Sequence, residues 1–114
     1  EDMAHLLTYV ASLPKPPSST VVDREAARGR DLFASAECAS CHTAGASDRT
    51  AHQVGTGGAF LTPTLAGIAM RSEMMHDGRY HTLDALLAGA TQMGRGSDLS
   101  PDDRRALVRY LETL

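Results

Sequence analysis

The sequence predicts an all-α fold whose centre is filled by a bound group and not by side chains alone. Apolar residues recur at helical spacing, and serine, threonine and aspartate stand where helices would begin. No strand pattern surrounds the two cysteines. Aromatic residues make up only 4% of the 114 residues and tryptophan is absent, although a chain of this length should form one domain with a core. A bound group is therefore expected at the centre of the fold.

The motif Cys38-Ala39-Ser40-Cys41-His42 indicates which group this is. Cysteines at C-x-x-C spacing, with a histidine directly after the second, are what covalent haem attachment requires. Cys38 and Cys41 would form thioether bonds to the porphyrin, and His42 would present an imidazole to the iron. We therefore expect one haem c, covalently attached.

Other chemistry fits this motif less well. A structural zinc site needs four ligands, but the chain has only two cysteines, and no pair of its other histidines follows Cys41 at the distance that a zinc motif requires. A thioredoxin-like redox pair needs a βαβ context. A simple disulfide would leave His42 without a role.

Charge and hydropathy exclude several classes of protein. The formal net charge is −3, and two haem propionates would make it more negative, which argues against nucleic acid and anionic membrane surfaces. No apolar run approaches the roughly 18 residues that span a bilayer. No signal peptide is visible and the chain begins at Glu1, so we expect a processed product or an excised fragment. Haem attachment to C-x-x-C-H takes place outside the bacterial cytoplasm, which predicts a periplasmic or exported location.

The N-terminal residues predict a helix followed by an extended connection. Residues 2–13 place their apolar side chains on one helical face, at Met3, Leu6, Leu7, Val10 and Leu13. Residues 14–19, with the sequence PKPPSS, would end this helix and stay stiff and extended. Residues 1–20 are therefore either the tail of a preceding domain or an N-terminal helix that packs on the haem domain, residues 21–114.

Two longer helices are marked by their caps. Asp23 is expected to cap a helix over residues 24–36, in which Ala26, Gly29 and Phe33 share one face. Ser100 and Pro101 would open the last helix. Its buried face is predicted to consist of Leu107, Tyr110, Leu111 and Leu114. The glycine would let the two helices cross closely, with the haem beneath the crossing.

The residues between these helices predict a loop and two short helices. Residues 44–62 are rich in glycine, threonine and alanine and predict a loop that passes close to the haem. Short helices are expected over residues 65–71 and from a Thr82 cap to Ala90. The carbonyl of Pro63 is expected to accept the Nδ1 hydrogen of the haem histidine. No internal repeat is evident.

From about Gly29 to Leu114 the chain resembles the C-terminal, electron-accepting haem domain of the bacterial di-haem cytochrome c peroxidase family, within the broader class I cytochrome c fold. The segments that carry the resemblance are Cys38 to His42, Val54-Gly55-Thr56-Gly57, Pro63-x-Leu65, His76-Asp77-Gly78 with Leu83 downstream, Met93-Gly94, and Tyr110 to Leu114. The resemblance implies a class I cytochrome c-like helical fold. It also implies Pro63 and Leu65 beside the haem, and His42 and Met93 as axial ligands.

The residues themselves leave the sixth iron ligand open. Met93 lies in a glycine-flanked loop before the last helix, where c-type cytochromes normally present this ligand. The alternatives are Met74, Met75, which stand where the family tends to have aromatic residues, His76, or an open site.

The turn at His76-Asp77-Gly78 has charged and polar neighbours. Arg71, Arg79, Tyr80 and His81 cluster around it and would be able to hydrogen-bond the haem propionates, since arginine pairs well with carboxylates. The alternative is a solvated surface turn. His5 and His52 are expected to have no chemical role.

Two functions remain for this sequence. One is an electron-transfer domain that exchanges single electrons with a redox partner protein or an adjacent domain. The other is a haem redox enzyme, peroxidase-like, or a ligand-binding haem domain with a labile distal site. In the family that the chain resembles, the peroxidatic haem occupies a separate N-terminal domain with its own C-x-x-C-H, and this chain has one such motif. The resemblance therefore implies a relay that is not an enzyme on its own.

Overall fold

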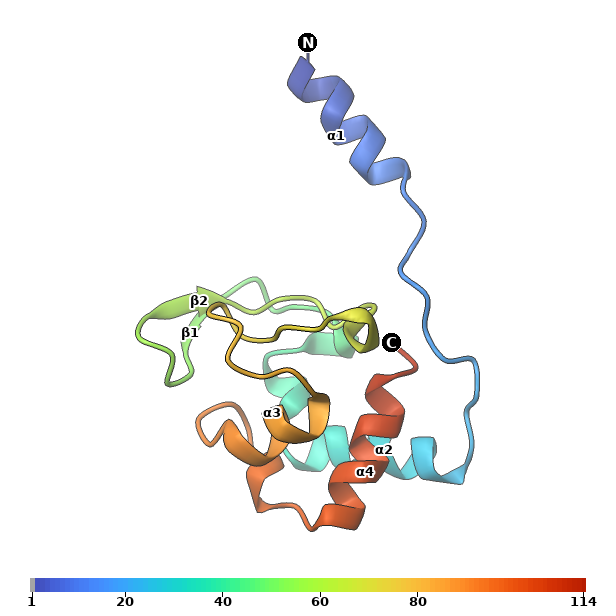
Figure 1. Ribbon diagram of the computed structural model, residues 1–114, viewed down its shortest axis with the longest axis vertical. Helices are drawn as coiled ribbons and strands as arrows, with labels where there is room; N and C mark the ends of the chain where they lie inside the picture. The colour runs from blue at the N-terminus through green and yellow to red at the C-terminus, as the bar shows by residue number, and fades with distance from the viewer. Residues whose placement is uncertain (1) are drawn as a thin grey trace.

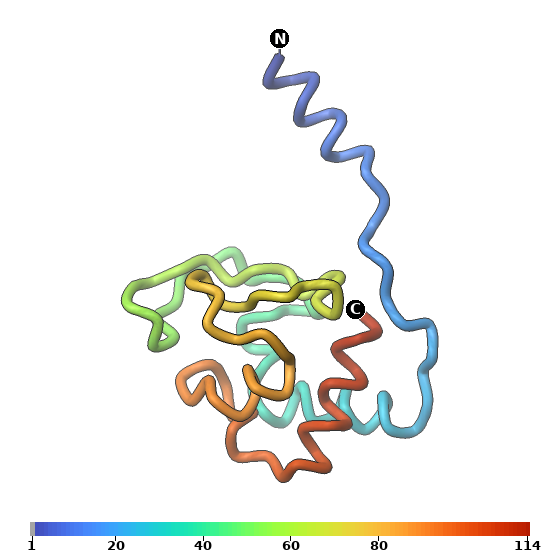
Figure 2. Tube along the Cα trace, viewed as in Figure 1, coloured from blue at the N-terminus to red at the C-terminus, as the bar shows by residue number. Residues whose placement is uncertain are grey.

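The computed structural model describes residues 2–114 and consists of a helical body from which one helix projects (Figure 1). The chain can be followed through this body in the Cα trace of Figure 2. Its elements are α1 (Asp2–Ser12), α2 (Arg24–Ser35), β1 (Ala51–Gln53), β2 (Ala59–Leu61), α3 (Leu83–Gly89) and α4 (Pro101–Leu111), with single 3₁₀ turns at Cys38–Ser40, Thr43–Gly45, Ile68–Met70 and Gly96–Asp98. The predicted helical fold class is confirmed.

The body is held together where α2 crosses α4. Gly29 of α2 meets the backbone of Ala106 so closely that an added Cβ would clash with its carbonyl. On one side of this contact the ring of Phe33 packs edge-on against that of Tyr110, with 5.4 Å between the ring centroids. Leu107 is fully buried, at 0% exposure. The crossing that the glycine and the aromatic residues predicted is therefore present.

All three predicted helix caps are confirmed. Asp23 Oδ1 accepts a hydrogen bond from the Ala26 N–H of α2 at 2.9 Å. Thr82 Oγ1 accepts one from the Ala85 N–H of α3, and Ser100 Oγ one from the Asp103 N–H of α4, each at 3.1 Å. Each cap satisfies a backbone donor that has no partner inside its helix.

Ser100→Ala is expected to lower the free energy of unfolding by about 1 kcal/mol, because it leaves an N–H in the first turn of α4 without its acceptor. Denaturant titration of the haem-loaded chain measures this change. Ser18→Ala, at an exposed position outside any helix, is the matched control and should leave the midpoint unchanged. Equal effects of the two substitutions would contradict the capping role.

The middle of the chain differs from the prediction in two places. The expected loop over residues 44–62 contains a small antiparallel hairpin, in which Ala51 pairs with Leu61 and Gln53 with Ala59. Strands of three residues with mostly exposed side chains have no hydrophobic alternation that would reveal them. The expected helix over residues 65–71 is only the 3₁₀ turn Ile68–Met70, because Gly67 before it adopts a left-handed conformation, with φ of 69°.

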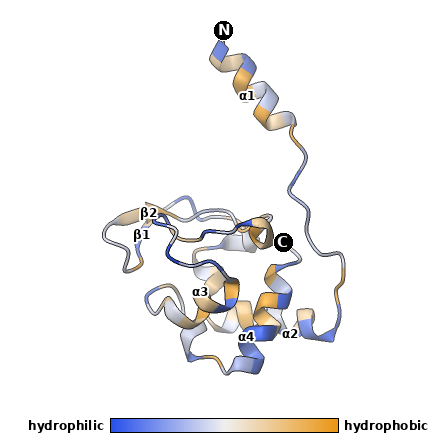
Figure 3. Ribbon diagram, in the orientation of Figure 1, coloured by the Kyte–Doolittle hydropathy of each residue, from blue (hydrophilic) through white to orange (hydrophobic). Residues whose placement is uncertain are grey.

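Helix α1 lies apart from the body (Figure 1), and no residue of Asp2–Ser12 is buried. The hydropathy colouring of Figure 3 shows apolar residues along this projecting helix. The linker, residues 13–23, by contrast contacts the body at two points. The Ser19 N–H donates to the Glu112 carbonyl at 2.8 Å, and the ring of Pro16 packs directly on Gly67. Among residues 2–114 there is no helix with the length and hydropathy to cross a membrane.

Candidate haem site

The C-x-x-C-H segment forms a single tight turn after α2. Glu37 adopts a left-handed conformation, with φ of 67°, and this ends the helix and turns the chain into Cys38–Ser40. The Cys38 carbonyl then accepts the N–H of His42 at 3.0 Å. The two cysteines are not joined by a disulfide, and both are partly exposed. This turn therefore places Cys38, Cys41 and His42 on one short segment of backbone, as attachment of one haem requires.

The imidazole of His42 is buried, with 8% of the residue exposed, and its orientation is fixed from one side. Nδ1 lies 3.1 Å from the Pro63 carbonyl oxygen and 3.2 Å from that of Ala46. Carbonyls only accept hydrogen bonds, so Nδ1 carries the proton and Nε2 keeps a lone pair for a metal. Burial lowers the pKa of His42, which favours the neutral form that binds iron.

The contact from Pro63 is the one expected from the sequence, whereas the contact from Ala46 was missed. Leu65 helps to position Pro63, because its N–H donates to the Gly45 carbonyl at 3.0 Å and its side chain packs against the core. Ala46 follows a turn in which Ala44 has a φ of 53°. A backbone acceptor of this kind depends on chain direction and not on residue type, so no sequence signal identifies it.

Met93 lies on a turn that is fastened to the C-x-x-C-H segment. The Arg95 N–H donates to the Ala36 carbonyl at 2.8 Å, two residues before Cys38. Gly94 has a φ of 71° and comes so close to Ala36 that an added Cβ would lie 2.9 Å from the same oxygen. Met93 itself is partly buried and packs against the core. The loop predicted to carry the sixth ligand therefore has a defined position next to the haem motif.

The alternative sixth ligands occupy different environments. Met74 is a core residue, 4% exposed, and its N–H donates to the Tyr80 carbonyl at 2.9 Å. His76 is exposed and stacks on Phe60, with 3.8 Å between the ring centroids. Met75 is partly buried, has a φ of 69° and lines the small cavity described next.

A cavity of about 80 Å³ lies between the turn after Met75, the glycine-rich loop and the end of α3. It is lined by Val54, Gly55, Thr56, Met75, Arg79, Tyr80, Gly89, Ala90, Thr91 and Gln92. Thr56 Oγ1 is buried and has no hydrogen-bond partner within residues 2–114. A buried hydroxyl beside an arginine and a tyrosine fits a carboxylate, which is the group that a haem propionate supplies.

Of the four residues predicted to hydrogen-bond the propionates, two line this cavity and two, Arg71 and His81, do not. Arg79 and Tyr80 line the cavity, and Arg79 Nη2 also lies 2.7 Å from Asp77 Oδ2, which holds the pKa of Asp77 below its usual range. Arg71 instead donates to the Thr64 carbonyl at 3.4 Å, on the exposed surface. His81 is exposed, and its Nδ1 lies 3.1 Å from the Ser72 carbonyl oxygen. Thr56 was missed, because a single threonine in a glycine-rich loop carries no signal of its own.

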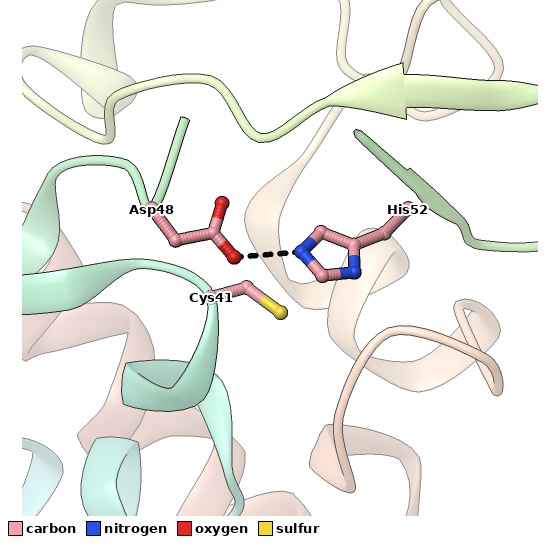
Figure 4. A group of neighbouring side chains, drawn as sticks. All are labelled: Cys41, Asp48 and His52. Atoms are coloured by element: carbon pink, nitrogen blue, oxygen red, sulfur yellow. Dashed lines mark hydrogen bonds and ion pairs between the residues drawn. The ribbon is translucent and has the colours of Figure 1, made fainter. Parts of the chain in front are cut away.

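Figure 4 shows a second polar group beside the haem motif, made of Cys41, Asp48 and His52. Their ligand atoms lie within 4.8 Å of one another, and His52 Nε2 is 2.6 Å from Asp48 Oδ2. This hydrogen bond lowers the pKa of Asp48. Once Cys41 forms a thioether, its sulfur is no longer an anionic ligand, and the two remaining side chains do not complete a zinc site. The group is therefore a structural neighbour of the attachment turn.

The fold and this site define a c-type haem protein: a small helical body, a C-x-x-C-H turn and a buried histidine with Nε2 free. The sequence model of the family described as Cytochrome c matches residues 26–114. The chain belongs to the cytochrome c family. No curated protein and no solved structure matches it significantly.

Membership of this family defines the cofactor and the general function. The chain carries covalently attached haem c with its iron, and its function is electron transfer with a redox partner. The haem supplies the one-electron chemistry, and the protein supplies attachment, orientation and burial. Cys38, Cys41 and His42 are the residues that fit the attachment and the proximal ligand.

Proposed function

We propose that this chain is a single-electron relay in which His42 and Met93 are the axial ligands of the haem iron. The observation that carries the proposal is the arrangement around His42: two carbonyls hold Nδ1, so Nε2 is free in the buried ring. Support for Met93 comes from its turn, which is hydrogen-bonded to Ala36, two residues before the haem motif. A thioether ligand raises the reduction potential of the haem relative to harder ligands.

The haem propionates are proposed to lie near Thr56, Arg79 and Tyr80. Thr56 offers a buried hydroxyl without a partner in the described chain, and Arg79 offers a guanidinium. Together they would neutralise and hydrogen-bond a carboxylate that would otherwise be costly to bury. On the opposite side of the haem, the Pro63 carbonyl would hold the His42 imidazole in place, and Leu65 would help to position Pro63.

The relay is proposed to be a poor peroxidase on its own. Peroxide activation needs a coordination position that the substrate can enter, and two protein ligands leave none. This agrees with the resemblance to the electron-accepting domain of di-haem peroxidases, whose peroxidatic haem lies in a different domain. The redox partner would then be an adjacent domain or another protein. A periplasmic or exported location follows from the place where C-x-x-C-H motifs receive their haem.

Two measurements on the haem-loaded chain test this proposal. Stopped-flow mixing with a small donor should reduce the haem rapidly, in a single one-electron phase. Steady-state assays with hydrogen peroxide and a reducing dye should show negligible turnover. Efficient turnover, or a high-spin ferric spectrum at neutral pH, would instead favour an enzyme with an open distal site. In that case Met75, which lines the cavity, becomes the residue to examine first.

A further inference from the structure

The first and last thirteen residues of the chain share a pattern that is too short to be evident as a repeat. Without gaps, the corresponding pairs are Asp2 and Asp103, Leu6 and Leu107, Leu7 and Val108, Tyr9 and Tyr110, Val10 and Leu111, and Leu13 and Leu114. Both segments are helical over most of their length, as α1 and α4. The two helices therefore present similar apolar and aromatic side chains at the same spacing.

In α4 this face closes the haem domain. Leu107 is 0% exposed and Leu111 5%, and Tyr110 packs edge-on against Phe33 of α2. The contact depends on Gly29, which lets the two backbones approach. The shared pattern is thus that of a helix that crosses a partner carrying a glycine and, four residues later, an aromatic residue.

In α1 the corresponding side chains are exposed. Leu6 is 53% exposed, Tyr9 63% and Val10 53%. Figure 3 shows the apolar residues of α1 on the helix that projects from the body. Leaving such a face in water is unfavourable, since each large apolar side chain gains roughly 1.5–3 kcal/mol on burial. We therefore expect the apolar face of α1 to be buried against a partner.

We propose that α1 is the closing helix of a second cytochrome c unit, and that its apolar face packs on a helix of the α2 type in that unit. The partner helix would have a glycine at the crossing point and an aromatic residue four positions later, and it would lie next to a haem.

The two closing helices differ at one position of the crossing. His5 stands where Ala106 lies in α4, so the crossing in the second unit must leave room for an imidazole.

Other positions for α1 agree less well with the structure. The α2 face of this domain is already filled by α4. The linker leads α1 away from that face, because Ser19 is bonded to Glu112 and Pro16 packs on Gly67. An anionic membrane surface is disfavoured, since residues 2–12 contain no lysine or arginine and begin with Asp2.

Because the linker contacts the haem domain, the second unit would be held close to it. The consequence for electron transfer rests on the proposed relay function. The linker fastens the end of the second unit to the edge of the haem domain near Gly67 and Glu112. Two units joined in this way encounter each other at a high effective concentration. The second unit is then the immediate redox neighbour of this domain.

The first test compares Leu6→Asp with Leu107→Asp in the 114-residue chain. Leu6→Asp should leave the melting temperature and covalent haem content unchanged, because no residue of α1 is buried against residues 2–114. Leu107→Asp should prevent formation of a stable haem domain, because it buries an unpaired charge. A clear fall in melting temperature with Leu6→Asp would mean that α1 packs on its own domain. A dimer in sedimentation that Leu6→Asp dissociates would mean that a second copy covers it. Either result overturns the proposal.

The second test uses the natural protein that contains this chain, purified with an affinity reagent for the haem domain. Haem content is expected to be at least two per copy of the domain, and one per copy would overturn the proposal.

Leu6→Asp, which has no effect in the 114-residue chain, should lower the melting temperature of the natural protein and release a species with less haem. Ala11→Asp, which adds the same charge at the position that corresponds to the partly exposed Glu112, is the matched control. Equal effects of the two substitutions would also overturn it. These measurements do not depend on Met93 or on peroxide, so they fail independently of the relay proposal.

Discussion

Met93→Ala is expected to abolish the weak far-red absorption band of sulfur-ligated ferric haem and to lower the reduction potential. A thioether stabilises ferrous iron more than ferric iron, so its loss favours the oxidised state. Axial ligands set haem potentials over a span of about 0.8 V, which makes this the largest functional change that one side chain here can cause. Optical spectra of both oxidation states and a redox titration measure the two effects.

The control for this change is Met70→Ala. Met70 is 64% exposed, in the 3₁₀ turn Ile68–Met70, and its loss should leave spectrum and potential unaltered. Met75→Ala should likewise keep the far-red band. If the band survived in Met93→Ala and disappeared in Met75→Ala, the sixth ligand would have to be reassigned to Met75.

Gly29→Ala is expected to be the most damaging single-methyl change in the chain. The added Cβ would overlap the Ala106 carbonyl, and backbone atoms held in a helix cannot move aside as a flexible side chain can. Overpacking at this crossing should cost about 3 kcal/mol or more, well above the roughly 0.5–1 kcal/mol by which alanine favours a helix over glycine. Thermal unfolding of the haem-loaded chain, or the yield of coloured protein, measures the loss.

Gly58→Ala provides the comparison. An added Cβ at Gly58 would meet only the ring of Phe60, at 3.3 Å, and that residue is 39% exposed and able to move. Its backbone does not adopt the left-handed conformation of its neighbours Gly55 and Gly57. Stability close to that of the unmodified chain is expected. A Gly29→Ala protein as stable as Gly58→Ala would show that the α2 and α4 backbones are farther apart than the structure indicates.

The features that could be predicted from the sequence are those that one residue type encodes locally. Asp23, Thr82 and Ser100 each cap the helix that they were expected to cap. The C-x-x-C-H motif has few chemical interpretations, and Gly29 with Phe33 indicated the crossing helices. In each case a side chain, or the lack of one, performs the function itself.

The features that escaped prediction depend on the path of the backbone. The hairpin of β1 and β2 is too short to have a periodic pattern. The Ala46 carbonyl reaches His42 only because the preceding turn has a left-handed residue. Thr56 becomes significant only because the surrounding fold buries its hydroxyl. Residue types at these positions are ordinary, and only the three-dimensional arrangement distinguishes them.

The double hydrogen bond at His42 has a consequence for how electron and proton movements are related. Its Nδ1 proton lies between the carbonyls of Pro63 and Ala46, and the ring is buried. Neither carbonyl takes up a proton at ordinary pH, and water has little access to the ring. A change in iron charge therefore cannot be balanced by protonation or deprotonation at this site. As the proposed iron ligand, His42 would thus keep electron transfer uncoupled from proton transfer, and its own titration would not make the reduction potential depend on pH.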